Sequence, residues 1–416
     1  MDCYDIAVVG GGASGLFAAL SAARAAAEID RKLKIIILEK NQRVGKKLLS
    51  TGNGRCNLTN LEARSALYHG DTASVAPILD RFPPNRVVEA FRKIGLICRV
   101  LDGGRVYPYS LQASSVLNIL RRALDAEGIQ TVCNFAVDKI SVSDGVFLLS
   151  GRRRSVPARR VIISTGGKAC PQSGSDGSGY SLLTPFGHTC TRLFPSLVQI
   201  RTDPKRVRPL KGIRCMAKAS VLSKGRVLKT EAGEVQFTEG ALSGICIFDL
   251  SRAAGEQGNL EITLNLAPEF KEKELIQFLL QTAKTCGFLP SPQIAEGLLP
   301  KALCVEVVRG ILESPSLPAS RLTESSVRDI ARRILDFRFP VLGTLPWKNA
   351  QVTAGGIPLC ETGKGLESKL CPGIFLCGEI LNLDGDCGGF NLHWAWASGY
   401  SSGRAAAVSL NHKNQP

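Results

Sequence analysis

The sequence has few of the residues from which metal sites and disulfide frameworks are built. It holds four histidines, and its fourteen cysteines never occur with the Cys-x-x-Cys spacing. A zinc framework and a disulfide scaffold are therefore not expected. The pattern favours reduced thiols in a cytoplasmic protein that binds no metal.

Long apolar runs are also missing. No run reaches the roughly 18 residues that a membrane helix needs, so we expect no membrane partner. The opening "MDCYDIAVVGGG" passes directly from Met1 into a strand-like run, and this predicts no secretory signal. With 416 residues, of which 44% are hydrophobic and 21% charged, the composition is that of a globular protein with two or three structural units.

Acidic residues are scarce relative to basic ones, which gives a formal net charge of +16. Residues 195–230 carry ten lysines or arginines against one acid, Asp203, a net charge of +9. The ten basic residues are Arg201, Lys205, Arg206, Arg208, Lys211, Arg214, Lys218, Lys224, Arg226 and Lys229. Two interpretations remain open, a solvated basic face or a surface for a polyanion. Residues 195–230 contain no aromatic side chain, so such a surface would follow phosphates rather than stack bases. A second basic cluster is "GRRRSVPARR", residues 151–160.

The N-terminal residues indicate a dinucleotide-binding βαβ unit. A short apolar run, Ile6–Val9, precedes Gly10-x-Gly12-x-x-Gly15, and an alanine-rich segment with helical periodicity follows. Gly10 suits a tight turn, Gly12 lets the backbone approach a pyrophosphate, and Gly15 lets the helix pack closely on the strand. The pyrophosphate is then expected at the helix N-terminus, where unpaired N–H groups favour negative charge.

The residues after these glycines complete the predicted site. Ala13 and Ser14 begin the expected helix, beside the pyrophosphate. The next strand, "LKIIILEK", ends at Glu39, whose carboxylate can accept hydrogen bonds from both ribose hydroxyls, and Lys40 follows it. We therefore predict that this segment binds a dinucleotide cofactor.

The C-terminal segment, residues 372–407, indicates that the dinucleotide is FAD. A strand at Ile374–Cys377 is followed by Gly378-Glu379, a glycine-rich turn and a final helix. In flavoproteins of the glutathione-reductase type, a late Gly-Glu after a strand holds the ribityl chain. The next helix directs its N-terminus at the flavin, where it stabilises the negative charge of the reduced ring. The residues at this helix start are Gly389, Phe390 and Asn391. The predicted fold is α/β, with a glutathione-reductase-like FAD-binding Rossmann domain built from both ends of the chain.

Six motifs in order resemble one known family over nearly the whole chain. They are "VGGGASGLFAA", "EKNQRVGKKLLSTGNGRCNLTN", "GRVYPYSLQASSVLNIL", "STGGKACPQSGSDGSGY", "VTAGGIPL" and "CGEILNLDGDCGGFNLHWAWASG". Together they resemble the YhiN/BaiN-type bacterial flavoproteins, which are also described as aminoacetone-oxidase-like. The resemblance implies a discontinuous FAD domain, an inserted β-barrel and a small helical subdomain. Some members reduce a uridine of large-subunit ribosomal RNA to dihydrouridine, and others are assigned to bile-acid or enone reduction.

The resemblance also implies that the loop "LSTGNGRCNLTN", residues 49–60, lies along the FAD. The cofactor contacts expected from this region are Lys47, Gly52, Asn53, Arg55 and Asn57. Cys56 has two interpretations, a proton donor near the flavin or a small buried residue packed against the ring.

The middle of the chain completes the FAD domain and inserts two further parts. "NFAVDKI", residues 134–140, predicts a strand whose Val137 contacts the adenine, and the strand "RVIIS" ends at Thr165-Gly166 beside the dinucleotide. The predicted FAD domain comprises residues 1–193 and 350–416. Alternating apolar residues predict a β-barrel-like domain over 194–267, and 3.6-residue periodicity predicts a helical subdomain over 268–349. The run "RDIARRILDFRF" repeats arginine on one helix face, which is either solvated or turned to RNA.

These features predict an FAD-dependent oxidoreductase that uses NAD(P)H as reductant. Hydride transfer to a uridine of 23S ribosomal RNA, the large-subunit RNA, agrees with both the charge and the resemblance. A small-molecule flavin oxidoreductase, acting on an enone, a steroid or an amine, is the alternative. Candidate proton donors are Cys56, Cys387, His393 and Tyr400, of which Cys56 is preferred because it lies in the cofactor loop.

Overall fold

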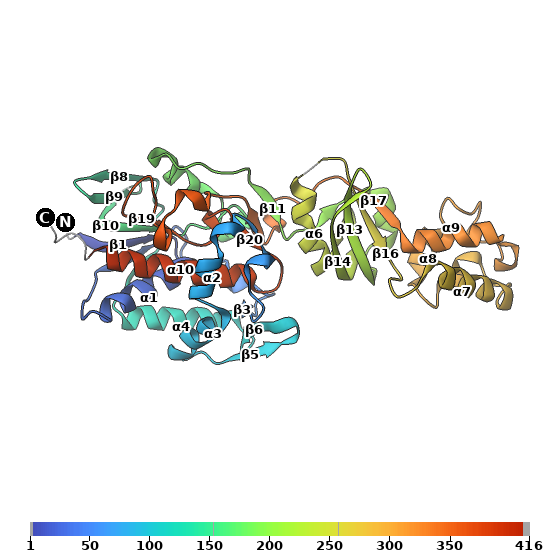
Figure 1. Ribbon diagram of the computed structural model, residues 1–416, viewed down its shortest axis with the longest axis horizontal. Coiled ribbons are helices and arrows are strands. Elements are labelled where there is room, and N and C mark those ends of the chain that lie inside the picture. Colours follow the sequence, from blue (N-terminus) through green and yellow to red (C-terminus); the bar gives the residue numbers. More distant parts are fainter. Residues whose placement is uncertain (1–2, 153, 257, 411–416) are drawn as a thin grey trace. The chain divides into compact units, whose positions relative to one another are not determined.

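The computed structural model describes residues 3–152, 154–256 and 258–410. The chain forms two compact units. One runs up to Phe194 and resumes at Val352, and the other spans Pro195–Gln351. We call them the discontinuous unit and the inserted unit (Figure 1). Each has its own buried hydrophobic cluster, which is the property expected of an independent domain.

Five parallel strands form the centre of the discontinuous unit. They are β1 (Tyr4–Val9), β2 (Ile35–Leu38), β7 (Gln130–Val132), β10 (Ser155–Ile163) and β19 (Ile374–Leu376). They pair in the order β7-β2-β1-β10-β19, and the hairpin of β8 (Lys139–Ser143) and β9 (Val146–Ser150) adds to β10 antiparallel. All four residues of β2 are buried, as in parallel sheets that are covered on both faces. Because β19 comes from the C-terminal segment, both ends of the chain build one sheet.

Two long helices, α1 (Ala13–Ala27) and α10 (Phe390–Ser409), pack against each other through glycines of α10. A Cβ built at Gly399 would lie 2.6 Å from the Ser14 carbonyl oxygen. One built at Gly403 would lie 2.2 Å from the Ala18 carbonyl oxygen. The two backbones therefore approach more closely than any larger residue would allow.

The same contacts show that α1 and α10 run in the same direction. Gly399 of α10 lies against Ser14 of α1, and Gly403, one turn later, lies against Ala18, also one turn later. Phe390, the first residue of α10, precedes Gly399 by nine residues. At about 1.5 Å per residue, α10 begins about 14 Å beyond the start of α1. The two helix N-termini thus open toward the same end of the unit.

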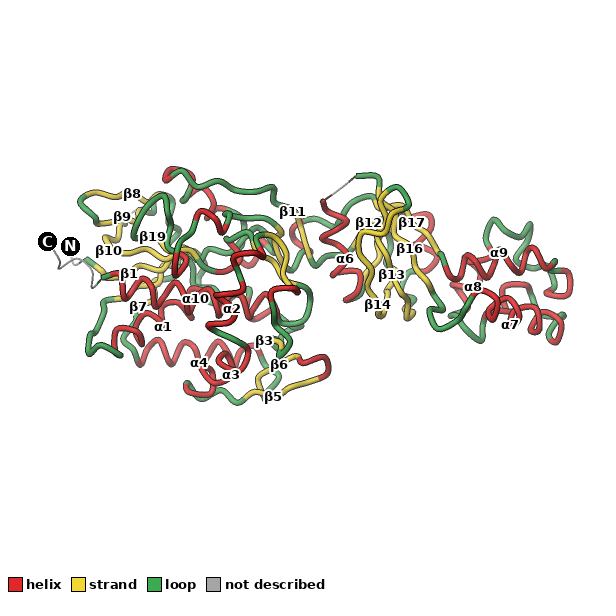
Figure 2. Tube along the Cα trace, in the orientation of Figure 1, coloured by secondary structure: helices red, strands yellow, loops and turns green. Residues whose placement is uncertain are grey.

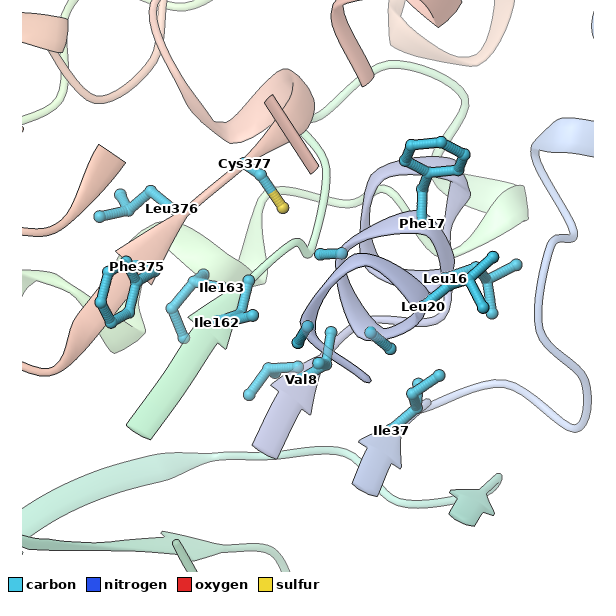
Figure 3. Packing of buried hydrophobic residues seen from close by; sticks show 14 of the residues in the cluster. Val8, Leu16, Phe17, Leu20, Ile37, Ile162, Ile163, Phe375, Leu376 and Cys377 are labelled. Carbon is cyan, nitrogen blue, oxygen red and sulfur yellow. The ribbon is translucent and has the colours of Figure 1, made fainter. Parts of the chain in front are cut away.

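Apolar side chains fill the space between these helices and the sheet. Figure 3 shows Leu16, Phe17 and Leu20 of α1 above Val8 and Ile37 of the sheet, with the β19 residues close by. On the far side, Phe17 packs on Phe91 at a ring-centroid distance of 5.7 Å. The helices that complete this layer are α2 (Ala76–Arg81), α3 (Pro84–Lys93) and α4 (Ala113–Ala126).

Short strands around this core form three smaller sheets. Their strands are β3 (Thr59–Asn60), β5 (Cys98–Leu101) and β6 (Arg105–Pro108); β4 (Tyr68–Gly70) and β20 (Leu383–Gly385); and β11 (Phe194–Ser196) and β18 (Val352–Ala354). The β4–β20 pair ties the segment before α3 to the loop that leads into α10.

The inserted unit contains a six-stranded sheet that is nearly closed. Its strands are β12 (Ile200–Arg201), β13 (Arg214–Ser223), β14 (Arg226–Phe237), β15 (Ala241–Ser243), β16 (Leu260–Asn265) and β17 (Phe337–Val341). They pair in the order β12-β15-β14-β13-β16-β17. The segment after β17 returns to β12, where the Arg201 backbone N–H donates to the Gly343 carbonyl at 2.8 Å. The expected barrel-like sheet is confirmed (Figure 2).

Helices accompany this sheet within the inserted unit. They are α5 (Pro204–Val207), α6 (Ile245–Glu256), α7 (Glu272–Thr285), α8 (Lys301–Val308) and α9 (Glu324–Leu335). α7 and α9 are the two helices that periodicity predicted. The structure differs from the prediction at 268–349, however, because β17 follows α9 and pairs with β16. The β-rich and helical parts therefore share one hydrophobic cluster instead of forming two domains divided at residue 267.

A second prediction was wrong at residues 134–140. Only Lys139 and Ile140 belong to a strand, and residues 134–138 form a loop. The loop lies along the end of β2, because the Phe135 backbone N–H donates to the Glu39 carbonyl at 2.9 Å. Loop backbone thus satisfies these groups without a regular ladder.

The close contact of α1 and α10 predicts that Gly403→Ala lowers stability. In an open helix this exchange raises stability by about 1 kcal/mol. Here the new Cβ would meet the Ala18 carbonyl at 2.2 Å, and overpacking of this kind costs about 1–3 kcal/mol. Thermal unfolding followed by circular dichroism would show a lower Tm for the variant. A higher Tm would contradict the packing described.

Candidate functional site: an FAD cradle

The Gly10–Gly15 turn has the geometry that a dinucleotide site needs. Gly10 has φ +103°, and a Cβ there would lie 2.6 Å from the Ser164 carbonyl oxygen. A Cβ at Gly15 would lie 2.0 Å from the Gly10 carbonyl oxygen, so α1 packs directly on the turn. A Cβ at Gly12 would meet nothing within 4 Å, and no side chain caps α1. The N-terminus of α1 is therefore bare and faces open space.

Residues predicted from both ends of the chain meet at this turn. Ser14, in the first turn of α1, is buried, and its Oγ would lie 2.4 Å from a Cβ at Gly378. Gly378 has φ +79° and donates its backbone N–H to Ser398 Oγ at 2.9 Å. Ala13 precedes Ser14 as the first residue of α1. The close approach explains why glycine occupies position 378.

Glu39 and Lys40 have different surroundings at the end of β2. The Glu39 side chain is buried, and its Oε2 accepts a hydrogen bond from the Gly11 backbone N–H at 2.8 Å. Its Oε1 accepts one from the Asn41 backbone N–H, also at 2.8 Å. This places the carboxylate beside the glycine turn. Lys40 instead forms an ion pair with Asp176 at 2.7 Å, so its ammonium is already neutralised.

The loop after β10 presents hydroxyl groups that have no partner in the described part of the chain. The Thr165, Ser175 and Tyr180 hydroxyl oxygens are buried and unpaired. A Cβ at Gly10 would lie 3.1 Å from the Thr165 Cα, which places Thr165 close to the turn. Gly166, with φ +74°, brings Ser175 Oγ within 2.9 Å of its own Cβ position. Buried polar atoms without partners are uncommon, because they lose hydration without compensation.

Lys47 lies with Glu379 rather than with the α1 N-terminus. Its Nζ is 2.7 Å from Glu379 Oε2. The other carboxylate oxygen accepts the Thr353 backbone N–H at 2.9 Å, and the Thr353 hydroxyl in turn accepts the Lys168 N–H at 2.7 Å. Glu379 also raises the pKa of Tyr180, although burial of the phenol contributes more to that rise. Lys47, Thr353 and Glu379 thus form one polar group.

The loop at residues 49–60 is tightly coiled through left-handed backbone. Gly52, Asn53, Gly54 and Cys56 have φ between +55° and +80°. The Asn57 side-chain oxygen is buried without a partner, and it would lie 2.8 Å from a Cβ at Gly389. The loop therefore presents an amide oxygen at the start of α10.

Other residues at this start have structural contacts. The Arg55 guanidinium lies over the Tyr107 ring at 5.3 Å and is exposed. Phe390 packs on Tyr68 at a centroid distance of 6.3 Å. The Gly385 backbone N–H donates to Asn391 Oδ1 at 2.9 Å, and Asn391 Nδ2 donates to the Gly385 carbonyl at 2.7 Å. Asn391 thus braces the preceding loop.

The start of α10 itself resembles that of α1. Gly389 has φ +105°, and no side chain caps the helix. The N-terminal N–H groups of both helices therefore face the same end of the unit without a capping side chain. Asn57 and Thr165, whose side-chain oxygens are unpaired, lie beside Gly389 and Gly10 at the two helix starts, and Ser175 lies beside Gly166. A long ligand with a pyrophosphate near α1 and a polar ring near α10 fits this arrangement, and FAD has that constitution.

Comparisons with known proteins agree with this geometry. A model of the HI0933-like protein Rossmann domain family matches residues 4–405. The chain belongs to this family. Membership confirms the resemblance to the YhiN/BaiN-type proteins that the six motifs carry.

Two curated relatives match over almost their full lengths. The 3-dehydro-bile acid delta(4,6)-reductase of Clostridium scindens is 36% identical over 408 residues, 97% of this chain and 98% of its own. The ribosomal RNA dihydrouridine synthase of Escherichia coli K12 is 24% identical over 408 residues, 96% of this chain and 97% of its own.

Among solved structures, the open conformation of a flavocytochrome c3 fumarate reductase has a TM-score of 0.51. It is 16% identical and covers 98% of this chain and 78% of that one. This likeness concerns the fold, and it confirms the predicted FAD-binding Rossmann architecture. This HI0933-like protein is thus an FAD-dependent oxidoreductase.

Two of the four candidate proton donors, Cys56 and His393, are fully buried, and Tyr400 is half-buried. Burial raises the pKa of the Cys56 thiol to about 12, and the residue belongs to the hydrophobic core. Burial lowers the pKa of the His393 imidazole to about 4, so the ring is neutral near pH 7. Tyr400 stacks on Phe82 at a centroid distance of 4.4 Å. For Cys56, this environment favours packing, the second interpretation left open by the sequence. Cys387 lies in the loop before α10 and is half-buried.

Val137 is half-buried in the loop beside β2 and packs on the hydrophobic core. The sequence predictions did not include Ser175 or Tyr180 as site residues. The signal for both was present in "GSDGSGY", whose hydroxyl residues alternate with glycines. Thr353 lies in "VTAGGIPL", one of the six motifs that carry the family resemblance.

Two searches gave negative results within the described residues. No group of three or more His, Cys, Asp or Glu side chains in this part of the chain is arranged to hold a metal ion. No described helix combines the length and the apolar character needed to cross a bilayer.

The geometry of the turn predicts that two glycine substitutions have different effects. Gly12→Ala adds a Cβ in the open space before α1, on backbone with φ −82° that alanine tolerates. It should weaken FAD binding by about tenfold or more while Tm changes little. Gly15→Ala should lower Tm by overpacking against Gly10. Flavin absorbance per protein and thermal unfolding of the apoproteins would separate the two. Full FAD retention by Gly12→Ala would contradict the site.

Proposed function

We propose that this enzyme reduces a carbon–carbon double bond conjugated to a carbonyl, and that its substrate is a uridine of 23S ribosomal RNA, in the large subunit. The names of the two curated relatives share this chemistry. A 3-dehydro-delta(4,6) bile acid carries double bonds conjugated to a ring ketone, and dihydrouridine is uridine whose 5,6 double bond, next to a ring carbonyl, has been reduced. In both, hydride adds at one carbon and a proton at the other.

Unpaired basic charge on the inserted unit carries the choice of RNA. Five basic side chains of residues 195–230 have neither an acidic nor a hydrogen-bonding partner among the described residues. They are Arg201, Lys205, Lys218, Lys224 and Arg226, all exposed. Others are neutralised, as Lys211 is by Glu239 at 3.2 Å and Arg214 is by Glu234 at 3.1 Å. A small substrate would engage one or two such charges, whereas an RNA backbone engages many.

Other basic side chains add less to this argument. Arg160 is buried and donates to the Ser409 hydroxyl at 2.8 Å. Arg154 lies over the Phe135 ring, and Arg153 lies outside the described residues. The arginines of α9 are also engaged, since Arg332 pairs with Glu272 at 2.9 Å. These contacts favour the solvated interpretation of that helix face.

A steroid-like enone is the second candidate substrate. The 36% identity to the bile-acid reductase favours it, since this exceeds the 24% identity to the RNA enzyme. The two substrates differ in size and charge, but both need FAD at the same cradle. Bound FAD, once reduced, would supply the hydride, and we infer that NAD(P)H is the reductant that reduces the flavin. The residues that would hold the FAD are those of the Gly10–Gly15 turn, Glu39, Asn57, Glu379 and the start of α10.

Reduction of a uridine within folded RNA needs the base to leave its stack. That step costs a few kcal/mol, which backbone contacts to a basic surface can offset. The exposed lysines and arginines of the inserted unit are suited to this role.

Mapping of dihydrouridine in large-subunit ribosomal RNA tests the proposed function. RNA from cells with and without the gene would be digested and analysed by mass spectrometry. We expect one dihydrouridine to disappear on deletion and to return with the wild-type gene, but not with Gly12→Ala. An identical profile in both strains would overturn the RNA substrate and leave the enone as the candidate.

The charge argument predicts unequal effects of two double substitutions that remove the same charge. Lys218→Gln with Arg226→Gln removes unpaired cations, and Lys211→Gln with Arg214→Gln removes paired ones. The first pair should weaken binding to a ribosomal RNA fragment by about tenfold and lower the slope of log K against log salt by about 1.5. The second pair should have a smaller effect on RNA binding, because these two cations are already neutralised by Glu239 and Glu234. Loss of the two ion pairs should leave the fold intact, since an exposed ion pair contributes only about 0–1 kcal/mol to stability. Equal losses in filter-binding titrations would refute the assignment.

A further inference from the structure

The reaction requires a proton donor, and one further candidate, His69, is absent from those that the sequence suggested. The buried positions of Cys56 and His393 remove them from contact with solvent, from which a donor must recover its proton, and the half-buried Tyr400 ring stacks on Phe82. The three described histidines differ in this respect. The side chains of His188 and His393 are fully buried, whereas that of His69 is 27% exposed.

His69 is held by a carboxylate from the loop that leads into α10. It lies on β4, directly opposite Asp384 of β20 in the antiparallel register. Its Nε2 is 2.7 Å from Asp386 Oδ1, and the Asp386 side chain is 18% exposed. A carboxylate on one ring nitrogen fixes the orientation of the imidazole and leaves the other nitrogen, Nδ1, for proton transfer.

The loop that carries Asp386 is fixed to the start of α10. The Asn391 amide bonds to the Gly385 backbone, and the Asp386 backbone N–H donates to the Leu67 carbonyl at 3.1 Å. Asn60 Nδ2 donates to the Gly388 carbonyl at 3.0 Å. The pair is therefore attached rigidly to the helix whose N-terminus belongs to the FAD cradle.

Other charged groups near His69 are acidic. Asp384 is buried on β20. Asp71 follows β4, where it accepts the Leu359 backbone N–H at 2.7 Å and the Asn382 amide at 3.0 Å. The segments that carry His69 and its partner therefore hold three acidic side chains, Asp71, Asp384 and Asp386.

We propose that His69, oriented by Asp386, donates the proton that completes reduction of the substrate double bond. This inference rests on the proposed function. As hydride adds to one carbon, the electrons of the double bond move onto the conjugated carbonyl. The N–H bond at His69 Nδ1 then breaks as the second C–H bond forms. The neutral imidazole recovers a proton from water, and a reduced nicotinamide dinucleotide supplies the next two electrons.

The test separates the two half-reactions of the FAD-loaded protein under anaerobic conditions. His69→Gln keeps a side-chain N–H that can donate to Asp386 but has no proton to give. We expect Tm, flavin content and the rate of flavin bleaching by NAD(P)H to match those of the wild type. Reoxidation by a large-subunit ribosomal RNA transcript should slow by about 100-fold or more, the usual contribution of a general acid. Asp386→Asn should give a smaller loss, and Cys387→Ser almost none.

The pH profile supplies a readout that a structural role would not affect. The wild-type reoxidation rate should fall as pH rises, because the step consumes a proton, and His69→Gln should lose this dependence. Wild-type rates in His69→Gln, or loss of FAD together with both half-reactions, would overturn the inference. A steroid 4,6-dien-3-one serves as a second probe. If the steroid alone reoxidises the flavin of the wild type, the RNA substrate is refuted, and His69→Gln is then compared with the wild type using the steroid. If neither probe reoxidises the flavin, both the proposed function and the role of His69 are refuted.

Discussion

The close parallel contact between α1 and α10 is the constraint on which the site depends. These helices come from opposite ends of the chain, and Gly399 and Gly403 let their backbones meet. The contact sets the start of α10 about 14 Å beyond that of α1. Because neither helix has a side-chain cap, two positive helix ends open in the same direction. The two positive helix ends match a dinucleotide that has a pyrophosphate for the start of α1 and, for the start of α10, a ring that becomes negatively charged on reduction.

Residues from distant parts of the sequence gather around this frame. Lys47 and Glu379 form an ion pair although 332 positions separate them. The Lys47 ammonium is therefore bound to a carboxylate that comes from the other end of the chain. The β4–β20 pair likewise joins His69 to the loop before α10. The cofactor cradle and the proposed proton donor therefore depend on the same C-terminal segment.

The parts of this account that the sequence predicted are those encoded locally. Gly10, Gly12 and Gly15 act within one turn, and Glu39 ends the next strand, so their spacing is sufficient. The long-range contacts were not accessible. The run "RDIARRILDFRF" was expected to continue as a helix, but α9 ends at Leu335 and Phe337 begins β17. Pairing with β16 decided that outcome, and helical periodicity carries no information about it. The same holds for Lys40, whose partner Asp176 lies in a distant loop.

The central claim is that the cradle delivers hydride to a uridine of ribosomal RNA. The most direct measurement is a single turnover in which the FAD-loaded protein, reduced beforehand and kept free of oxygen, is mixed with a large-subunit ribosomal RNA transcript. We expect the flavin to reoxidise and one dihydrouridine to form for each flavin oxidised. A flavin that stays reduced with the RNA, yet reoxidises with a steroid 4,6-dien-3-one, would contradict it.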